Sequence, residues 1–147
     1  MQLTADEARA RFSGARVLRL ATADRTGVPH VVPCTFAVDA AARIVIGIDH
    51  KPKTTLNLRR LRDIEENTRV SLLADSYTED WPRLWWARAD GTAVIEREGT
   101  DHDAHWRQLR SKYPQYAGQA LTGPVIVVTV QRWSGWVYSS PADGGAR

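Results

Sequence analysis

The order of hydrophobic and polar positions along the chain predicts six strands and three helices. Stretches in which apolar residues alternate with polar ones, or run together over a few positions, are typical of strands. These stretches are residues 15–23, 28–38, 43–49, 69–76, 84–98 and 124–139. A helical spacing of apolar residues is found instead in residues 3–15, 54–67 and 100–113.

Each predicted helix begins near a side chain that can accept a hydrogen bond from a free backbone N–H group. The predicted capping residues are Thr4 with Glu7, Thr54 or Thr55, and Thr100 with Asp103. The spacing of apolar residues also predicts which face two of the helices bury. These residues are Leu58, Leu61 and Ile64 in the second helix, and Trp106, Leu109 and Tyr113 in the third.

Glycine and proline mark where the strands turn or bend. Turns are expected at residues 24–27 and 39–42. Pro29 and Pro33 lack a backbone N–H group, which places their strand at a sheet edge or a bulge. Gly91 predicts a bend in the fifth strand, and Gly135 predicts a break in the last one.

This order of elements favours an α+β fold. Short turns join the first three strands, which makes them antiparallel neighbours and differs from the strict alternation of a parallel α/β fold. We therefore expect a mostly antiparallel split β-barrel with peripheral helices. One domain is expected over residues 1–147, with an N-terminal helix within 1–14 and a loose tail at 139–147.

Composition narrows the possible environments and partners. The chain is 43% hydrophobic and 25% charged, as in ordinary globular proteins. Its apolar runs are too short to span a bilayer and its first residues lack an apolar signal core, so we expect a cytoplasmic protein without a membrane partner. A net charge of +3 is weak for a nucleic-acid-binding protein. The single cysteine, Cys34, excludes an intramolecular disulfide.

Residues 50–62, HKPKTTLNLRRLR, contain five cations and no acidic residue. The cations are Lys51, Lys53, Arg59, Arg60 and Arg62. The two lysines lie at the expected junction of strand and helix, where a positive helix end and free N–H groups attract phosphate. The hydroxyls of Thr54 and Thr55 can donate there as well. We interpret Arg59 and Arg62 as a solvated helix face, and the lack of aromatic residues argues against a nucleic-acid site.

Other chemical motifs are weak or missing. The sequence has no glycine-rich phosphate fingerprint, no Walker motif and no nucleophile elbow. His102 and His105 lack further metal ligands at a suitable spacing, so a polar helix start is the simpler interpretation. Cys34 is interpreted as a small buried strand residue. Trp85 and Trp86 should point to opposite faces of their strand, so one of them should cover a partner subunit or a flat ring.

Three segments together resemble a known family. They are residues 17–39, VLRLATADRTGVPHVVPCTFAVD, residues 44–93, which include the basic segment, and residues 125–136, VIVVTVQRWSGW. The order of these segments along the chain resembles that of the pyridoxamine-phosphate-oxidase-like split β-barrel enzymes. Within these the chain is similar to the small actinobacterial branch that uses the deazaflavin coenzyme F420.

The resemblance implies a homodimer with the cofactor at the subunit interface. The cofactor ring would lie along the second and third strands, and the phosphate at the junction that follows the third strand. The implied cofactor-binding residues are Val32, Pro33, Cys34, Thr35, Ile48, Asp49, Lys51, Lys53, Thr54, Thr55, Asn57 and Arg60. Because the chemistry belongs to the cofactor, neither a catalytic residue nor a metal ligand is assigned.

The leading hypothesis is an oxidoreductase that passes a hydride between coenzyme F420 and a small conjugated or heteroaromatic substrate. One alternative is the same fold with flavin mononucleotide (FMN), acting as an oxidase or reductase. Another is a non-catalytic protein that stores or senses a flavin, a haem or a similar ring. A further alternative, a nucleic-acid-binding module, predicts that the protein binds DNA or RNA with an affinity that depends steeply on salt.

Overall fold

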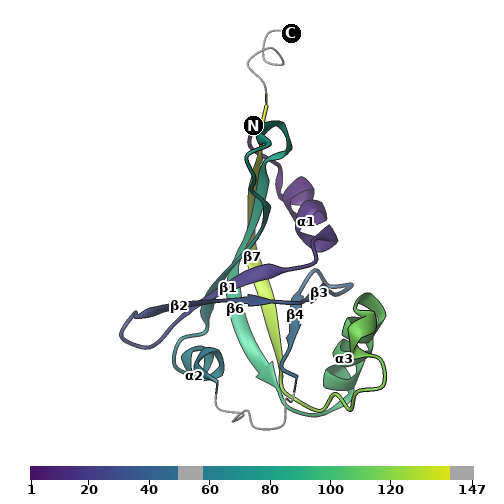
Figure 1. Cartoon of the computed structure of the whole chain (residues 1–147). Coiled ribbons are helices and arrows are strands. Elements are labelled where there is room, and N and C mark those ends of the chain that lie inside the picture. Colours follow the sequence, from purple (N-terminus) through teal and green to yellow (C-terminus); the bar gives the residue numbers. More distant parts are fainter. Residues whose placement is uncertain (50–57, 140–147) are drawn as a thin grey trace.

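The computed structural model describes residues 1–49 and 58–139, in which seven strands form one curled antiparallel sheet (Figure 1). The order of strands across the sheet is β2-β1-β5-β6-β7-β4-β3. Their bounds are β1 Leu18–Ala23, β2 Pro29–Cys34, β3 Ala37–Val38, β4 Ile44–Gly47, β5 Arg69–Ser76, β6 Trp85–Glu96 and β7 Val125–Val137. The α+β fold with a mostly antiparallel sheet is confirmed.

The long strands β6 and β7 form the centre of the sheet and pair along their whole length. Their register shifts at Gly91, where Gln131 is the extra residue on β7, so the predicted bend at Gly91 is confirmed. A Cβ atom at Gly91 would collide with the carbonyl oxygen of Thr129, which explains the glycine. The predicted break at Gly135 is wrong, because Gly135 pairs regularly with Ala87.

The stretch 28–38 forms two strands rather than the single strand that was predicted. Thr35 and Phe36 carry the chain from β2, at one edge of the sheet, to β3, at the other edge. The Tyr113 hydroxyl accepts a 3.1 Å hydrogen bond from the Phe36 N–H group and lies 2.9 Å from the Phe36 carbonyl oxygen. Tyr113, 77 positions away from Phe36 in the sequence, thus holds the segment that crosses from β2 to β3. The predicted edge position of β2 is confirmed.

Helix α1 (Ala5–Gly14) packs on the upper half of β6 and β7 (Figure 1). Its capping box is confirmed, because Thr4 Oγ1 accepts from the Glu7 N–H group and Glu7 accepts from the Thr4 N–H group. The buried Phe12 ring packs edge-on against Phe36 and Trp133, with 5.2 Å between ring centroids in both pairs. The helix therefore closes one face of the main core.

Helix α2 (Arg59–Glu66) begins later than predicted. Its N-cap is Leu58, so a threonine cap at Thr54 or Thr55 is wrong for this helix, and both threonines lie outside the described residues. The predicted apolar face is confirmed for Leu61 and Ile64, which are buried in the main core.

Helix α3 (Thr100–Lys112) covers a second core next to β4 and the first part of β7. Its predicted apolar residues Trp106, Leu109 and Tyr113 are buried, as expected. The predicted Thr100–Asp103 cap is wrong, because the N-cap is Gly99 and no side chain caps the helix. Two short 3-10 turns, η1 (Trp81–Arg83) and η2 (Pro114–Tyr116), complete the described elements.

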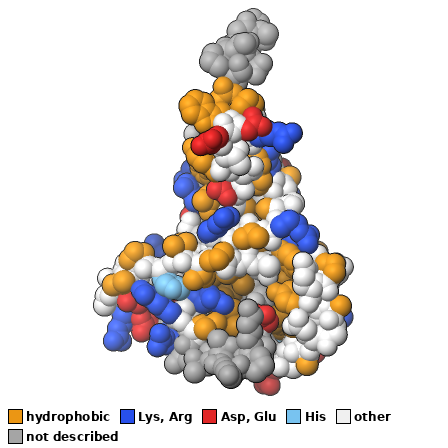
Figure 2. All heavy atoms as spheres, in the orientation of Figure 1, with side chains coloured by type: hydrophobic (Ala, Val, Ile, Leu, Met, Phe, Trp, Pro, Cys, Tyr) orange, Lys and Arg blue, Asp and Glu red, His pale blue; other side chains and the backbone are white. Residues whose placement is uncertain are grey.

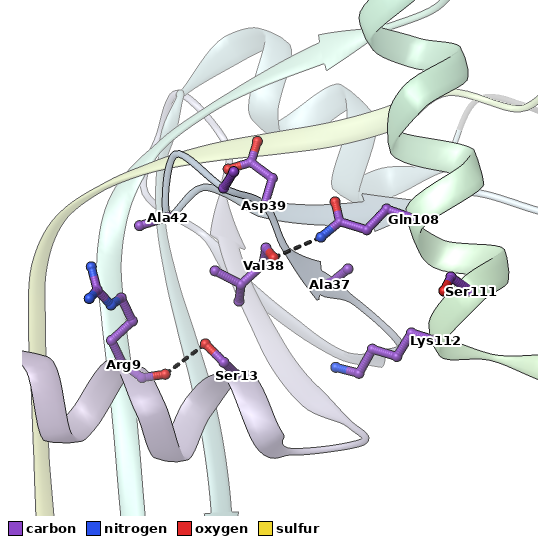
Figure 3. Close-up of a pocket in the computed structure, with 10 residues that line it drawn as sticks. Arg9, Ser13, Ala37, Val38, Asp39, Ala42, Gln108, Ser111 and Lys112 are labelled. Atoms are coloured by element: carbon purple, nitrogen blue, oxygen red, sulfur yellow. Dashed lines mark hydrogen bonds between the residues drawn. The ribbon is translucent and has the colours of Figure 1, made fainter.

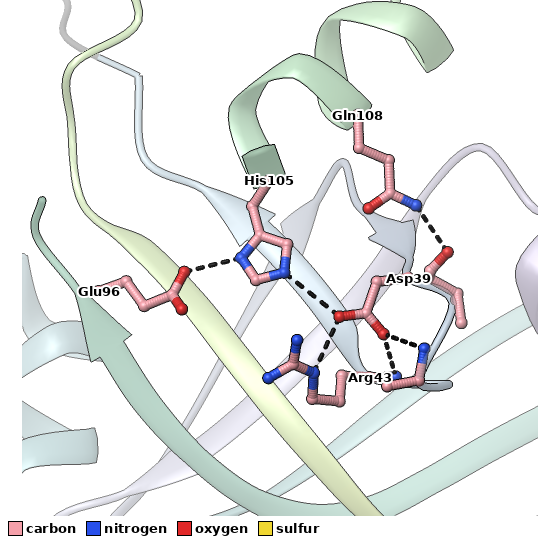
Figure 4. A network of polar contacts seen from close by, with 7 residues as sticks. Asp39, Arg43, Glu96, His105 and Gln108 are labelled. Atoms are coloured by element: carbon pink, nitrogen blue, oxygen red, sulfur yellow. Dashed lines mark hydrogen bonds and ion pairs between the residues drawn. The ribbon is translucent and has the colours of Figure 1, made fainter. Parts of the chain in front are cut away.

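The interpretation of His102 and His105 as a polar helix start is wrong, because both are buried. His105 Nδ1 lies 2.7 Å from Glu96 Oε1, and Nε2 lies 3.2 Å from Asp39 Oδ2 (Figure 4). His102 bonds instead to the Gly123 carbonyl oxygen at 2.7 Å. Both histidines thus have structural roles.

No helix among the described residues has the length and apolar character needed to cross a membrane.

Candidate functional site

Strand β2 presents two different faces, and the predicted ring-binding residues divide between them. Val32 and Cys34 are half-buried and pack against the main core. Val31 and Pro33 are exposed on the opposite face, since side chains alternate along a strand. The structure therefore separates Pro33 from Val32 and Cys34, although all three were predicted to contact the cofactor.

The positive charge of Arg60, on α2, acts on the thiol of Cys34. Burial raises the pKa of the Cys34 thiol, and Arg60 offsets only part of that rise. Reactive cysteines need a lowered pKa, because the thiolate is the nucleophile. Cys34 is therefore suited to pack against a ligand and not to attack one.

The first turn of α2 carries Arg60, the cation whose charge acts on Cys34. Its N-cap Leu58 makes no side-chain cap bond, and among the described residues the Leu58 carbonyl oxygen accepts from the Leu61 N–H group at 3.1 Å, which leaves the N–H groups before Leu61 outside the hydrogen bonds of the helix. Arg59 is exposed and pairs with Asp63 at 3.9 Å, and Arg62 is also exposed. The interpretation of these two arginines as a solvated face is confirmed, whereas Arg60 is half-buried.

Two buried polar atoms at this place lack a partner among the described residues. They are Nε of Arg60 and Nδ1 of His30, which lies on the inward face of β2. Buried polar groups are normally hydrogen-bonded, so such atoms need an explanation. Figure 2 shows cationic side chains gathered around a histidine over β2 and α2. This chemistry fits a ligand with an anionic group.

The remaining predicted site residues are only partly described. Ile48 is buried at the end of β4, where its N–H group donates to the Pro124 carbonyl oxygen at 2.8 Å, and Asp49 is half-buried beside it. Both therefore continue from β4 into the predicted phosphate junction. Five further residues lie outside the described residues: Lys51, Lys53, Thr54, Thr55 and Asn57.

Thr35 borders a cavity of about 300 Å³ at the crossing between β2 and β3. Its Oγ1 lies 2.9 Å from the Tyr116 hydroxyl, and the Arg16 guanidinium lies over the Tyr113 ring at 4.7 Å. Aromatic walls with one charged group at the rim are typical of sites for small planar ligands. The sequence did not indicate Tyr113 or Tyr116 for this place.

A larger cavity of about 490 Å³ lies between α1, α3 and the turn after β3 (Figure 3). Its polar groups already bond to the protein: Gln108 donates to the Val38 carbonyl oxygen, and Lys112 donates to the Ala15 carbonyl oxygen. Burial, with a smaller contribution from Arg16, lowers the pKa of Lys112 to about 8. The satisfied polar groups make this cavity a weaker candidate than the β2–α2 region, despite its size.

No group of three or more histidine, cysteine or acidic side chains is placed to hold a metal within residues 1–49 and 58–139.

Comparison with solved structures places this fold among known relatives. An FAD-binding protein from Mesorhizobium loti has 22% sequence identity and a TM-score of 0.69, covering 92% of this chain and 95% of its own. An FAD-binding protein from Mycobacterium smegmatis has 17% identity and a TM-score of 0.62, covering 92% and 96%. A heme-binding protein from Mycobacterium smegmatis has 22% identity and a TM-score of 0.70, covering 92% and 55%. At these identities the likeness shows a shared fold.

Sequence comparison is more specific about the family. No curated protein is significantly similar to the chain. The family model of pyridoxamine 5'-phosphate oxidase, however, matches residues 4–137, which include every described strand and helix. With its curled antiparallel sheet and peripheral helices, the chain belongs to the pyridoxamine 5'-phosphate oxidase family and has its split β-barrel fold.

Proposed function

We propose that this chain is an oxidoreductase that binds the deazaflavin coenzyme F420 and transfers a hydride between it and a small electron-poor substrate. The observation that carries the proposal is Arg60, whose buried Nε has no partner among the described residues at the start of α2. In a member of this family, a cation and free N–H groups beside an edge strand suit the phosphate of such a cofactor.

The residues of this chain would bind and orient the cofactor. Arg60 and the first N–H groups of α2 would hold the phosphate, together with Lys51, Lys53, Thr54, Thr55 and Asn57, which lie outside the described residues. Val32 and Cys34 would line the ring. When bound, F420 supplies a ring carbon that donates or accepts a hydride. Cys34 would pack there as a neutral thiol, since burial raises its pKa.

A homodimer is part of the proposal. The outer face of β2 and the turn before it expose apolar side chains beside the candidate site: Val31 is 64% exposed and Val28 is 48% exposed. Exposed apolar groups at a sheet edge favour contact with another subunit. Light scattering should give twice the mass of one chain, and Val31→Lys should reduce that mass. A monomeric wild-type protein would contradict the dimer.

The cofactor is tested by titrating the purified protein with F420 and, separately, with FMN. Tryptophan fluorescence and cofactor absorbance report binding. We expect saturable binding of F420, weakened in Arg60→Gln by about 1.5–3 kcal/mol for loss of a hydrogen bond to a charged group. Arg62→Gln is the matched control, because Arg62 is exposed two positions further along the helix. Tighter binding of FMN than of F420 would favour the flavin alternative. Equal F420 affinity in the Arg60→Gln and Arg62→Gln variants would show that Arg60 does not contact the cofactor.

A second candidate is a protein that binds a flavin or haem without turnover. It is supported by the solved structures of the same fold that are FAD-binding or heme-binding proteins. Tight binding of FAD or haem, with no hydride transfer to a panel of quinones and unsaturated ketones, would favour this role.

A further inference from the structure

Two other buried polar atoms without partners lie together, away from the β2–α2 region. Among the described residues they are Nε of Arg88, on β6, and Oγ of Ser134, on β7. These two residues face each other across the β6–β7 pair, and both line one cavity of about 240 Å³. Two unsatisfied atoms in one cavity indicate a missing hydrogen-bonding partner.

The walls of this cavity are aromatic and cationic. Trp86 and Trp136 form the next cross-strand pair on the same face of the sheet as Arg88 and Ser134, two residues along each strand. The Arg88 guanidinium lies over the Trp86 ring, 5.2 Å from its centroid. Arg132, on the same face, adds a second positive charge. We refer to these five residues as the tryptophan–arginine cavity.

One carboxylate offsets part of this charge. Asp90 Oδ2 lies 3.4 Å from Arg88 Nε as an ion pair without a hydrogen bond, and Asp90 Oδ1 accepts from the Ser71 hydroxyl. Arg132 has no acidic partner within ion-pair distance among the described residues. The two arginines and one aspartate leave the cavity with a net positive charge.

We propose that the tryptophan–arginine cavity binds a small planar aromatic carboxylate. A carboxylate matches the forked geometry of a guanidinium and can also accept from the Ser134 hydroxyl. The indole rings provide flat apolar surfaces for an aromatic ring. At about 240 Å³, the cavity is smaller than the roughly 300–1,000 Å³ of sites for drug-sized ligands and suits a ligand with a single ring. Its lining residues on β6 and β7 are different from those of the proposed cofactor site on β2 and α2.

Benzoate is a suitable probe, and the indole N–H signals of the six tryptophans report where it binds in the full chain. The variants Trp86→Phe and Trp136→Phe assign the two relevant signals. Benzoate should shift these signals in a saturable manner with a Kd below about 1 mM, while the signal of the buried Trp106 in the second core stays in place. Cyclohexanecarboxylate, which lacks a flat ring, and benzyl alcohol, which lacks the charge, should bind more weakly.

Variants distinguish specific binding of benzoate at Arg88 from a general effect of positive surface charge. Arg88→Gln should raise the Kd for benzoate about tenfold or more, and Arg88→Lys should give an intermediate value because it keeps the charge without the fork. Arg83→Gln is the matched control, because that side chain is 82% exposed and pairs only with Asp80 among the described residues. Thermal unfolding checks that each variant is folded.

Two results would overturn the proposal. One is the lack of a saturable shift, or the same Kd in Arg88→Gln as in the wild type. The other is that the Trp86 and Trp136 signals follow protein concentration and not benzoate, which would make this face a contact between two copies of the chain.

Discussion

Thr22 Oγ1 donates a 2.7 Å hydrogen bond to Asp63 Oδ2 inside the protein, and both side chains are buried. This bond joins β1 to α2, the helix that carries Arg60. Thr22→Val keeps the shape of the side chain but leaves a buried carboxylate without its hydroxyl donor. We expect a loss of about 1–3 kcal/mol in the free energy of unfolding, measured with urea.

The matched control is Thr129→Val, the same substitution at an exposed strand position. It should change stability by less than about 0.5 kcal/mol. Equal effects of the two substitutions would show that the Thr22–Asp63 bond does not hold α2 in place.

Gly91 and Gly14 offer the same substitution in opposite environments. A Cβ atom at Gly91 would meet the carbonyl oxygen of Thr129 within the central strand pair, whereas nothing lies within 4 Å of a Cβ atom at Gly14. Gly91→Ala should therefore destabilise the protein by about 1–3 kcal/mol or more. Gly14→Ala, at the end of α1, should be neutral or stabilising by up to about 1 kcal/mol. Thermal unfolding of both variants measures the difference, and a stable Gly91→Ala protein would contradict the close approach.

The ionisation of Asp39 makes the stability of the fold depend on pH. Burial acts to raise the pKa of Asp39, but bonds from the Arg43 N–H group, His105 and the Arg43 guanidinium outweigh burial and lower it. A carboxyl whose pKa is lowered in the folded state stabilises the fold above its unfolded pKa of about 3.9. That contribution is lost as pH falls through the folded pKa.

The wild type should therefore lose stability below about pH 4 more steeply than Asp39→Asn, which is less stable at neutral pH. Urea midpoints between pH 3 and pH 6 measure these slopes. Asp6→Asn is the control, because the Asp6 side chain is 90% exposed. Parallel curves for wild type and Asp39→Asn would show that the Asp39–His105–Glu96 network does not respond to acid.

Lys112 should titrate near pH 8. Reductive methylation with ¹³C-formaldehyde labels the lysine side chains, and Lys112→Arg identifies the signal. Because the folded pKa of Lys112 lies below the ordinary lysine value of 10.5, its charge destabilises the fold at neutral pH. The free energy of unfolding should therefore increase as pH rises from about 8 towards 10.5. A midpoint near 10.4, as in an exposed lysine, would show that Lys112 is not buried between α1 and α3.

The lysines of the basic segment remain a prediction from sequence. The double variant Lys51→Ala, Lys53→Ala should weaken cofactor affinity by about 1–3 kcal/mol, if both make charge-assisted bonds to phosphate. Titration with F420 measures the change, with Arg62→Gln as a control for general loss of positive charge. Unchanged cofactor affinity in the double variant would show that these lysines do not bind the phosphate.

Local patterns predicted local structure well. Strand β5 spans Arg69–Ser76, the same residues as the predicted strand, and its buried positions Val70, Leu72 and Ala74 recur at every second residue. The Thr4–Glu7 capping box also formed, since its two bonds join residues three positions apart. The bend at Gly91 was predictable because a glycine inside a strand commonly marks a bulge or a close approach of the backbone.

Features set by distant residues were not predictable from local pattern. The division of β2 from β3 depends on the Tyr113 hydroxyl, and the burial of His105 depends on Asp39, which lies 66 positions away. In the candidate site, sequence indicated Cys34 and Arg60 only through family resemblance. The unsatisfied His30 Nδ1 leaves no trace in the sequence, because hydrogen-bond satisfaction is a property of the folded chain.

The position of β7 has a consequence for how the protein folds. This strand follows every other strand along the chain, yet it lies between β6 and β4 in the sheet. β3 and β4 pair with each other, but they join the rest of the sheet only through β7. During synthesis, this pair of strands, with the apolar side chains of Ile44, Val45 and Ile46, therefore cannot join the sheet until β7 leaves the ribosome. Because these pairings join residues far apart in the sequence, we expect folding to be slower than in a fold built from local contacts. We expect the nascent chain to be prone to aggregation until β7 is made.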